Sequence, residues 1–186
     1  GYAQLLQRVG GLASQYARTI GRSANHMLAL VNDLIEYARG VNSEQPAPMP
    51  VYINAWLDAI AREALLLVER RGNRFVLRLD QPLPPVLVTD AKRLRQMLIN
   101  LLDNAAKFTI EGRVELQVSA KCQPHVAGAA KTLELVLAVR DTGMGIAPAD
   151  QARLFEPFYR TTSAAGVQGV GLGLSIVQIW AERMGG

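Results

Sequence analysis

The sequence NLLDNAAKFT at residues 100–109 decides how this chain is interpreted. Apolar residues recur at helical spacing through it, and Thr89-Asp90 is a helix-capping pair, so a helix is predicted to run to about Phe108. Asn100, Asn104 and Lys107 follow at steps of four and three, which places them on one polar face. Two amide oxygens suit Mg²⁺, and a lysine one turn away can neutralise phosphates. An ordinary solvent-exposed face is the alternative.

Two glycine-containing segments lie further along the chain. In DTGMGI at 141–146, which follows a predicted strand, Asp141 could accept a hydrogen bond from an exocyclic amine such as that of adenine, and Gly143 and Gly145 allow close backbone approach. A plain turn is the alternative. In GVGLGL at 169–174, glycine backbone opens a helix predicted at roughly 172–184, a setting suited to phosphate. The segment matches neither a Walker A loop nor a dinucleotide fingerprint.

Between the glycine segments lies LFEPFYR at 154–160, followed by small polar residues at 161–166. Aromatic anchors before a soft segment are typical of a hinged lid over a ligand, and a surface loop is the alternative. Each of these signals is weak by itself. Their occurrence in this order is far more specific.

The four segments resemble the N, G1, F and G2 boxes of the histidine-kinase catalytic domain, a Bergerat-fold ATPase domain related to those of DNA gyrase B, Hsp90 and MutL. The resemblance covers the chain from about Val51 onward. It implies ATP and Mg²⁺ as cofactors, with Asn104 and Asn100 at the metal and Lys107 positioning phosphate as the catalytic residue. It also implies an ATP-binding set made of Asn100, Asn104, Lys107, Asp141, Gly143, Gly145, Phe155, Phe158, Arg160, Gly169, Gly171 and Gly173.

Within that set the resemblance gives each group a role. Asp141 would contact the adenine amine, while Gly143 and Gly145 would line the base pocket. Phe155 and Phe158 would anchor the lid, from which Arg160 would reach the phosphates. The three glycines at 169, 171 and 173 would bind phosphate through backbone N–H groups.

Two features favour a sensor kinase over the hydrolysing members of this superfamily. Those members have a glutamate as general base at the first N-box position, where this chain has Asn100. Residues 1–6 are similar to the stretch just after the H box, and residues 23–39 resemble the second helix of the dimerisation hairpin. The resemblance implies a phosphoacceptor histidine about three helical turns before Gly1. Neither His26 nor His125 matches an H-box position.

Domain organisation follows from the N-terminal pattern. Small or apolar residues from Ile20 to Ala38 alternate in steps of four and three, which is typical of a helical bundle and most simply of a homodimer. Packing of this seam on the following domain is the alternative. We predict a partial helical hairpin at 1–40, interrupted at Gly10-Gly11, a proline-rich linker at 41–50, and a catalytic domain at 51–186 whose final strands are missing.

The catalytic part is predicted to be α+β, a two-layer α/β sandwich, because strands and helices do not alternate regularly. Strands are expected at 51–53, 74–79, 86–88, 113–121 and 132–140, with a helix at about 55–70 that has Asn54 as its N-cap.

Composition limits the partners. The chain has 186 residues, 49% of them hydrophobic, and a net charge of +4 without any polybasic run, so we expect no nucleic-acid binding. The single cysteine excludes an internal disulfide. No apolar run could span a bilayer, so a cytoplasmic location is expected, with any inner-membrane anchor of a parent protein outside this chain. The expected partner is a response regulator or receiver domain.

Two other functions are consistent with the same motifs. A degenerate kinase would act by heterodimerisation, with vestigial nucleotide binding. A hydrolytic relative of the mismatch-repair or topoisomerase ATPases would turn ATP over, although Asn100 opposes this.

Overall fold

The computed structural model describes residues 2–41, 45–122, 132–161, 167 and 169–186. Its first element is one helix, α1 (Tyr2–Val41), which runs through Gly10 and Gly11. The predicted interruption at these glycines is therefore wrong. A glycine costs a helix interior roughly 1 kcal/mol, whereas each residue added to an existing helix adds a hydrogen bond. The pairing of α1 with a second arm stays a prediction.

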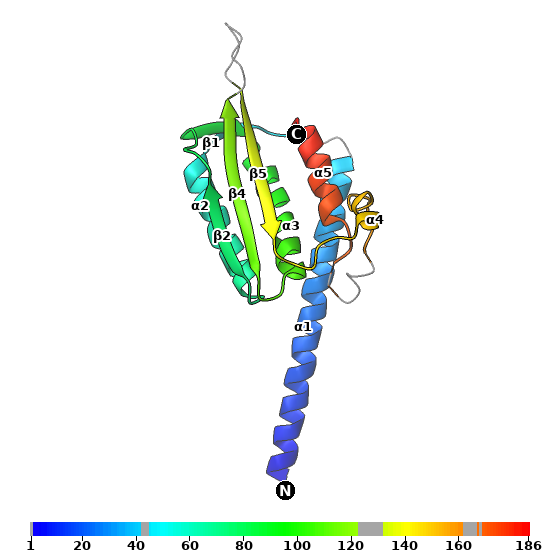
Figure 1. The fold of residues 1–186 in the computed structure, drawn as a ribbon. Coiled ribbons are helices and arrows are strands. Elements are labelled where there is room, and N and C mark those ends of the chain that lie inside the picture. The colour runs from blue at the N-terminus through cyan, green and yellow to red at the C-terminus, as the bar shows by residue number, and fades with distance from the viewer. Residues whose placement is uncertain (1, 42–44, 123–131, 162–166, 168) are drawn as a thin grey trace.

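In the described part of the chain, five strands form two sheets. β1 (Met49–Tyr52) pairs antiparallel with β3 (Val86–Thr89). The larger sheet has the order β2-β4-β5, in which β4 (Arg113–Cys122) is parallel to β2 (Arg74–Leu79) and antiparallel to β5 (Leu133–Asp141) (Figure 1). This mixed arrangement confirms the predicted α+β class and all of the predicted strands, with no bound shifted by more than two residues.

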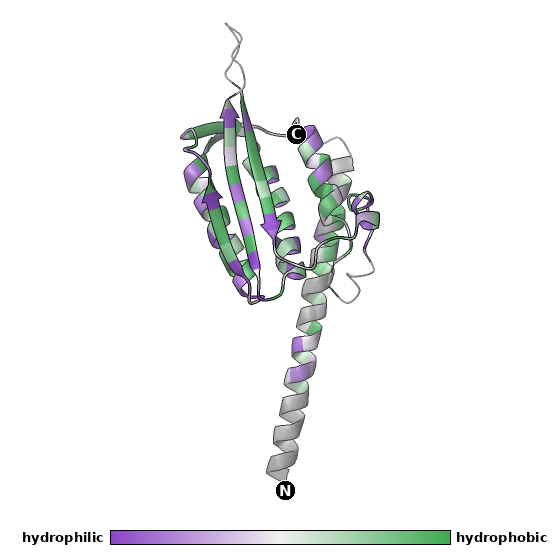
Figure 2. Cartoon of the chain, viewed as in Figure 1, coloured by the Kyte–Doolittle hydropathy of each residue, from purple (hydrophilic) through white to green (hydrophobic). Residues whose placement is uncertain are grey.

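Helices α2 (Ile53–Glu69) and α3 (Ala91–Phe108) cover one face of the larger sheet. Hydrophilic and hydrophobic residues alternate along β4 (Figure 2). Its apolar residues Val114, Leu116 and Val118 are buried in one cluster with residues of α2 and α3. Each fully buried aliphatic side chain contributes about 1.5–3 kcal/mol. The core between the two layers contains Ile53, Leu57, Ile60, Val68, Leu98, Leu102, Val114, Leu116 and Val118.

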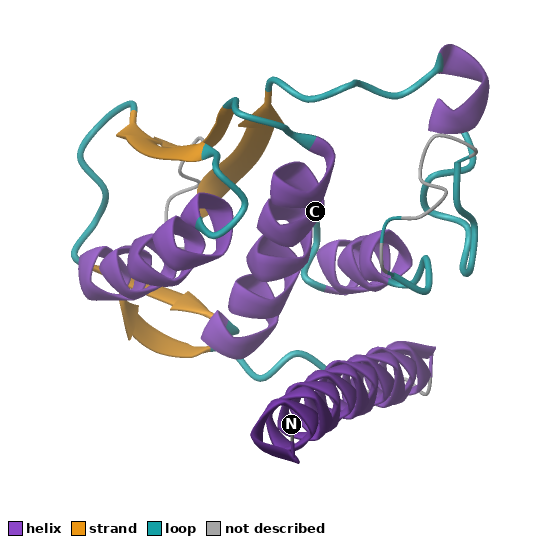
Figure 3. Ribbon diagram, turned by 90° about the horizontal axis from the view of Figure 1, so that it is seen from below, coloured by secondary structure: helices purple, strands orange, loops and turns teal. Residues whose placement is uncertain are grey.

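Helix α5 (Gly173–Arg183) packs on the other side of α3, so that α3 lies between α2 and α5 (Figure 3). Trp180 is fully buried there, and the guanidinium of Arg93 lies 4.0 Å from its ring centroid. Leu172 and Ile176 complete this second core together with Met97 of α3. The polar face of α3 is thereby held close to the start of α5.

The C-terminal part of α1 contacts α5, while its N-terminal half extends away from the other elements (Figure 1). Along the predicted seam, Ile20, Met27, Val31 and Leu34 are 69%, 59%, 53% and 52% exposed. At these positions the seam does not pack on the following domain, so that alternative is wrong. Among the described residues, neither α1 nor any other helix has an apolar stretch that could cross a membrane.

The helix N-termini follow the predictions in part. Asp90 is the N-cap of α3 as predicted, and its Oδ1 accepts a 3.0 Å hydrogen bond from the Arg93 N–H. Asn54 is not a cap, because α2 begins at Ile53, whose backbone N–H donates to the Pro85 carbonyl at 3.2 Å. The pairing of β1 with β3 therefore sets the start of α2. A short helix, α4 (Pro148–Gln151), was not predicted.

Candidate functional site

A cavity of about 1150 Å³ lies where α3, the end of β5 and the glycine segments meet. Most of the residues predicted from the sequence line it, although they come from segments far apart in the chain. Leu30 of α1 lies on its wall as well. The predicted residues that line this cavity are Asn100, Asn104, Lys107, Asp141, Gly143, Gly145, Arg160, Gly169, Gly171 and Gly173.

The polar face of α3 forms one wall. The Asn100 Nδ2 donates a 3.4 Å hydrogen bond to the carbonyl oxygen of Gly173. A Cβ on Gly173 would lie 3.8 Å from the Asn104 Nδ2, which is ordinary van der Waals contact. Asn100 makes this bond through its nitrogen, so the bond does not use its amide oxygen. The predicted N-box and G2 segments are therefore in direct contact.

The segment after β5 lies against the C-terminal end of α3. The Asp141 side chain is exposed, and its Oδ1 accepts a 2.8 Å hydrogen bond from the Gly143 N–H. A Cβ on Gly143 would collide with the carbonyl oxygen of Phe108, and the Met144 N–H donates to that same oxygen at 3.3 Å. Only glycine fits at 143, and this close packing fixes Asp141 at the edge of the cavity.

Gly171 fits the start of α5 for a different reason. Its φ is +80°, and a Cβ there would lie 2.6 Å from the carbonyl oxygen of Tyr159. The Phe158 N–H donates to the Gly171 carbonyl oxygen at 3.0 Å. Leu172, the N-cap of α5, makes no side-chain cap hydrogen bond, so the helix begins with glycine backbone on the cavity wall. Backbone N–H groups at a helix N-terminus attract anions.

The predicted lid falls partly outside the described residues, which omit positions 162–166 and 168. On its described flanks, the Arg160 Nη2 donates to the Val167 carbonyl oxygen at 2.6 Å, and both residues line the cavity. Phe155 and Phe158 do not line it, and their side chains are 44% and 57% exposed. The Phe158 ring meets Tyr37 of α1 edge to face, with centroids 6.3 Å apart. The structure thus does not bring these two phenylalanines into the cavity.

A hydrogen-bonded cluster supports the segment before the lid. The Tyr159 hydroxyl donates to the Asp150 Oδ1 at 2.6 Å, and this bond together with desolvation raises the pKa of Tyr159. Arg153 stacks on the Tyr159 ring at 4.2 Å and pairs with Glu156 at 2.9 Å. The hydrogen bond to Glu156 raises the pKa of Arg153 further. Tyr159 itself lines the cavity.

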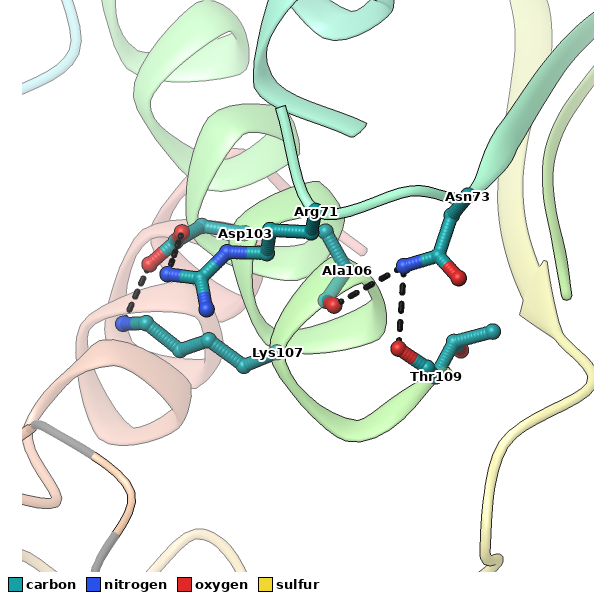
Figure 4. A network of polar contacts seen from close by, with 6 residues as sticks. All are labelled: Arg71, Asn73, Asp103, Ala106, Lys107 and Thr109. Carbon is teal, nitrogen blue, oxygen red and sulfur yellow. Dashed lines mark hydrogen bonds and ion pairs between the residues drawn. The ribbon is translucent and has the colours of Figure 1, made fainter. Parts of the chain in front are cut away.

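Two charged residues of the cavity were not predicted. Asp103 forms an ion pair with Lys107 one helical turn away, and Arg71 approaches the same carboxylate at 3.8 Å (Figure 4). The spacing of Asp103 and Lys107 is an i, i+4 signal that the sequence carries. Arg71 belongs to a turn thirty-two positions before Asp103, and no sequence pattern links the two.

The residues of the cavity fit a magnesium-bound nucleotide. At Gly143 and Gly171 a Cβ would collide with neighbouring backbone, so glycine is needed at both positions to bring these cavity-lining segments together. Asp141 supplies an acceptor at one side, and the start of α5 supplies backbone N–H groups at another. Amide oxygens of Asn100 and Asn104 are suitable Mg²⁺ ligands when phosphate oxygens and water complete the shell.

The segments that form most of this cavity match a known protein family. Residues 89–186 match the family described as histidine kinase-, DNA gyrase B-, and HSP90-like ATPase. This match covers more than half of the chain, and the chain belongs to that family.

Its relatives within the family are sensor kinases. The chain is 30% identical to the signal transduction histidine-protein kinase BarA of Escherichia coli strain K12, over 92% of this chain and 18% of the relative. It is 33% identical to the sensor histidine kinase AruS of Pseudomonas aeruginosa, over 100% of this chain and 19% of the relative. It therefore spans about a fifth of the length of these curated relatives.

A solved structure has a similar fold. Full-length ShkA, crystallised in complex with AMPPNP, superposes with a TM-score of 0.73 at 32% identity, over 92% of this chain and 34% of that chain. The fold is thus that of the ATP-binding domain of histidine kinases.

Proposed function

We propose that this chain is the nucleotide-binding part of a sensor histidine kinase. In this proposal it binds Mg²⁺-ATP in the cavity, and the γ-phosphate passes to a histidine outside these 186 residues and then to a response-regulator aspartate. The observation that carries the proposal is the convergence of Asn104, Asp141 and Gly171 on one cavity. Kinship with sensor histidine kinases supports the same reaction.

Each wall of the cavity would serve one part of the nucleotide. The Asp141 carboxylate would accept a hydrogen bond from the adenine amine, and it is held in place by the Gly143 N–H. The backbone N–H groups that follow Gly171 would bind phosphate oxygens at the positive end of α5. Lys107, only 18% exposed, would neutralise phosphate charge from the α3 side. These groups bind and orient the nucleotide, which is most of what phosphoryl transfer requires.

Magnesium would supply charge neutralisation across the phosphates. Asn104 and Asn100 would hold it through amide oxygens, which agrees with the donation of the Asn100 nitrogen to Gly173. An asparagine at position 100 has no basic group to activate water, so the proposed site favours transfer to an acceptor over hydrolysis.

The exposed apolar seam of α1 supports a homodimer. Ile20, Met27, Val31 and Leu34 leave more than half of their surface exposed, and burial against a second copy of the helix would remove it from water. We further propose a cytoplasmic location, with any membrane anchor of the parent protein outside these residues. The proposed pairing with a response regulator rests on the kinship with sensor histidine kinases.

The test is incubation of the chain with γ-labelled ATP and Mg²⁺. We expect saturable ATP binding and no labelled protein, because neither His26 nor His125 matches an H-box position. Acid-labile phosphate on either histidine would contradict the proposal. Substantial steady-state release of inorganic phosphate would favour the hydrolytic branch, and absence of ATP binding would favour a degenerate kinase.

A further inference from the structure

Arg71 occupies a place on the cavity wall that the nucleotide-binding segments do not explain. It lies in the turn between α2 and β2, just before Gly72, whose φ is +76°. Its side chain nevertheless reaches the same wall as Asp103, Asn104 and Lys107. The positively charged side chain of Arg71, which comes from a separate segment, thus lies beside the predicted polar face of α3.

The turn that carries Arg71 is fixed to α3 by the buried Asn73, which is 4% exposed. The Asn73 Nδ2 donates to the carbonyl oxygens of Ala106 at 3.2 Å and Thr109 at 2.9 Å (Figure 4). Its Oδ1 accepts from the Gly112 N–H at 3.0 Å. These bonds satisfy carbonyl groups at the C-terminal end of α3, which lack partners within the helix. The backbone next to Arg71 therefore has a fixed position relative to Lys107 at the end of α3.

The charges at this wall do not cancel. The carboxylate of Asp103 pairs with Lys107 and lies 3.8 Å from the Arg71 Nη2 (Figure 4). Two cations therefore share one anion, and a net positive charge faces the cavity. The Arg71 side chain is 43% exposed, so it can turn toward an incoming anion without unfolding the turn. A guanidinium presents several N–H donors in one plane, which suits phosphate oxygens.

We infer that Arg71 is a second phosphate-binding cation of this cavity, and that Asp103 is the positioning residue that holds it beside Lys107. This inference rests on the proposed function, since it assumes that the phosphates of a nucleotide lie along this wall. The contribution of Arg71 should grow with the number of phosphates. It should be absent for adenosine, which has none.

The test compares Arg71→Gln with the unchanged chain in calorimetric titrations of ATP, ADP and adenosine at one ionic strength. The affinity for ATP should fall about fivefold, as expected for loss of one partly exposed charge-assisted contact, with a smaller loss for ADP and no change for adenosine. Arg71→Lys should recover part of the ATP affinity because it keeps the charge. Arg70→Gln is the matched control, since Arg70 is the preceding residue, is exposed and does not line the cavity.

The outcomes separate this inference from the proposed function. If the unchanged chain binds no ATP, the proposed function fails. If it binds ATP and Arg71→Gln binds equally well, the inference alone is overturned. An equal loss for adenosine and ATP would also overturn it, because that result indicates a structural role in the turn. Thermal unfolding of each variant shows whether it is folded, and competition by inorganic tripolyphosphate gives a second readout that does not involve the base.

Discussion

The side-chain nitrogen of Asn100 donates a hydrogen bond to the carbonyl oxygen of Gly173, although the two residues are 73 positions apart. This contact joins the polar face of α3 to the glycine backbone that opens α5. The proposed site depends on that junction, because neither segment alone encloses a ligand. The predictions below concern this site, the segments that support it and the exposed seam of α1.

Asn104→Ala should reduce the gain in ATP affinity that Mg²⁺ provides. It should reduce the ATP affinity measured without Mg²⁺ by less. The amide oxygen of Asn104 is a proposed metal ligand, and mutation of such a ligand removes one oxygen from the coordination shell. In titrations with ATP, the gain in affinity on adding Mg²⁺ should shrink about tenfold relative to the unchanged chain. Asn54→Ala, an exposed change on α2, serves as the control. An unchanged magnesium effect would remove Asn104 from the metal site.

Asp141→Asn should lower ATP affinity by about tenfold or more, because the new amide presents a donor to the donor amine of adenine. The variant should stay folded, since the asparagine oxygen can still accept the hydrogen bond from the Gly143 N–H. Calorimetric titration measures the affinity, with Asp58→Asn on the exposed side of α2 as the control. Identical ATP binding by the Asp141 variant would show that this carboxylate does not contact the base.

Gly171→Ala should destabilise the chain by about 3 kcal/mol, since left-handed backbone and a collision with the Tyr159 carbonyl oxygen act together. Gly185→Ala isolates the backbone effect, because Gly185 has a φ of +84° with nothing near a Cβ. That control should lose only about 1 kcal/mol. Urea unfolding measures both variants. Equal losses would mean that no close approach exists at Gly171.

The hydrogen bond between Tyr159 and Asp150 predicts a stability change in alkaline solution. The bond to the Asp150 carboxylate and desolvation raise the pKa of Tyr159, so the folded state favours its neutral form. This contribution is fully present below the unfolded pKa of about 10 and is lost as the pH rises through the folded pKa. Unfolding in urea from about pH 9 to about pH 11 should show a steeper loss in the unchanged chain than in Tyr159→Phe. Parallel curves would contradict the assignment.

Met27→Glu should make the chain monomeric if the α1 seam is the dimer interface. Met27 is 59% exposed, and a carboxylate at this position would face its counterpart in a dimer. Light scattering after size-exclusion chromatography measures the mass, and Gln15→Glu on the opposite side of α1 is the control. A mass that is the same for both variants and for the unchanged chain would place any interface elsewhere.

The local elements were predictable because their signals lie in short stretches. The alternation along 113–121 predicts β4, and Asp90 before an apolar helical pattern predicts the start of α3. The polar face of Asn100, Asn104 and Lys107 follows from helical spacing alone, and the structure places all three on the cavity. Only the order of the motifs, through the family resemblance, indicated that distant segments meet.

The sequence failed where a tertiary contact decides the outcome. Asn54 has a capping side chain, yet α2 starts earlier because the Ile53 N–H bonds to the Pro85 carbonyl oxygen. Gly10 and Gly11 would end a short helix but not one as long as α1. Arg71 lines the cavity because the hydrogen bonds of the buried Asn73 hold its turn against α3. Residue spacing in the sequence does not indicate these bonds.

A crystal structure of this chain grown with Mg²⁺ and a non-hydrolysable ATP analogue tests the central claim most directly. The account predicts the adenine amine within hydrogen-bonding distance of the Asp141 carboxylate. It also predicts phosphates between Asn104 and the backbone that follows Gly171. A nucleotide bound at another surface, or a cavity without nucleotide at a saturating concentration, would contradict it.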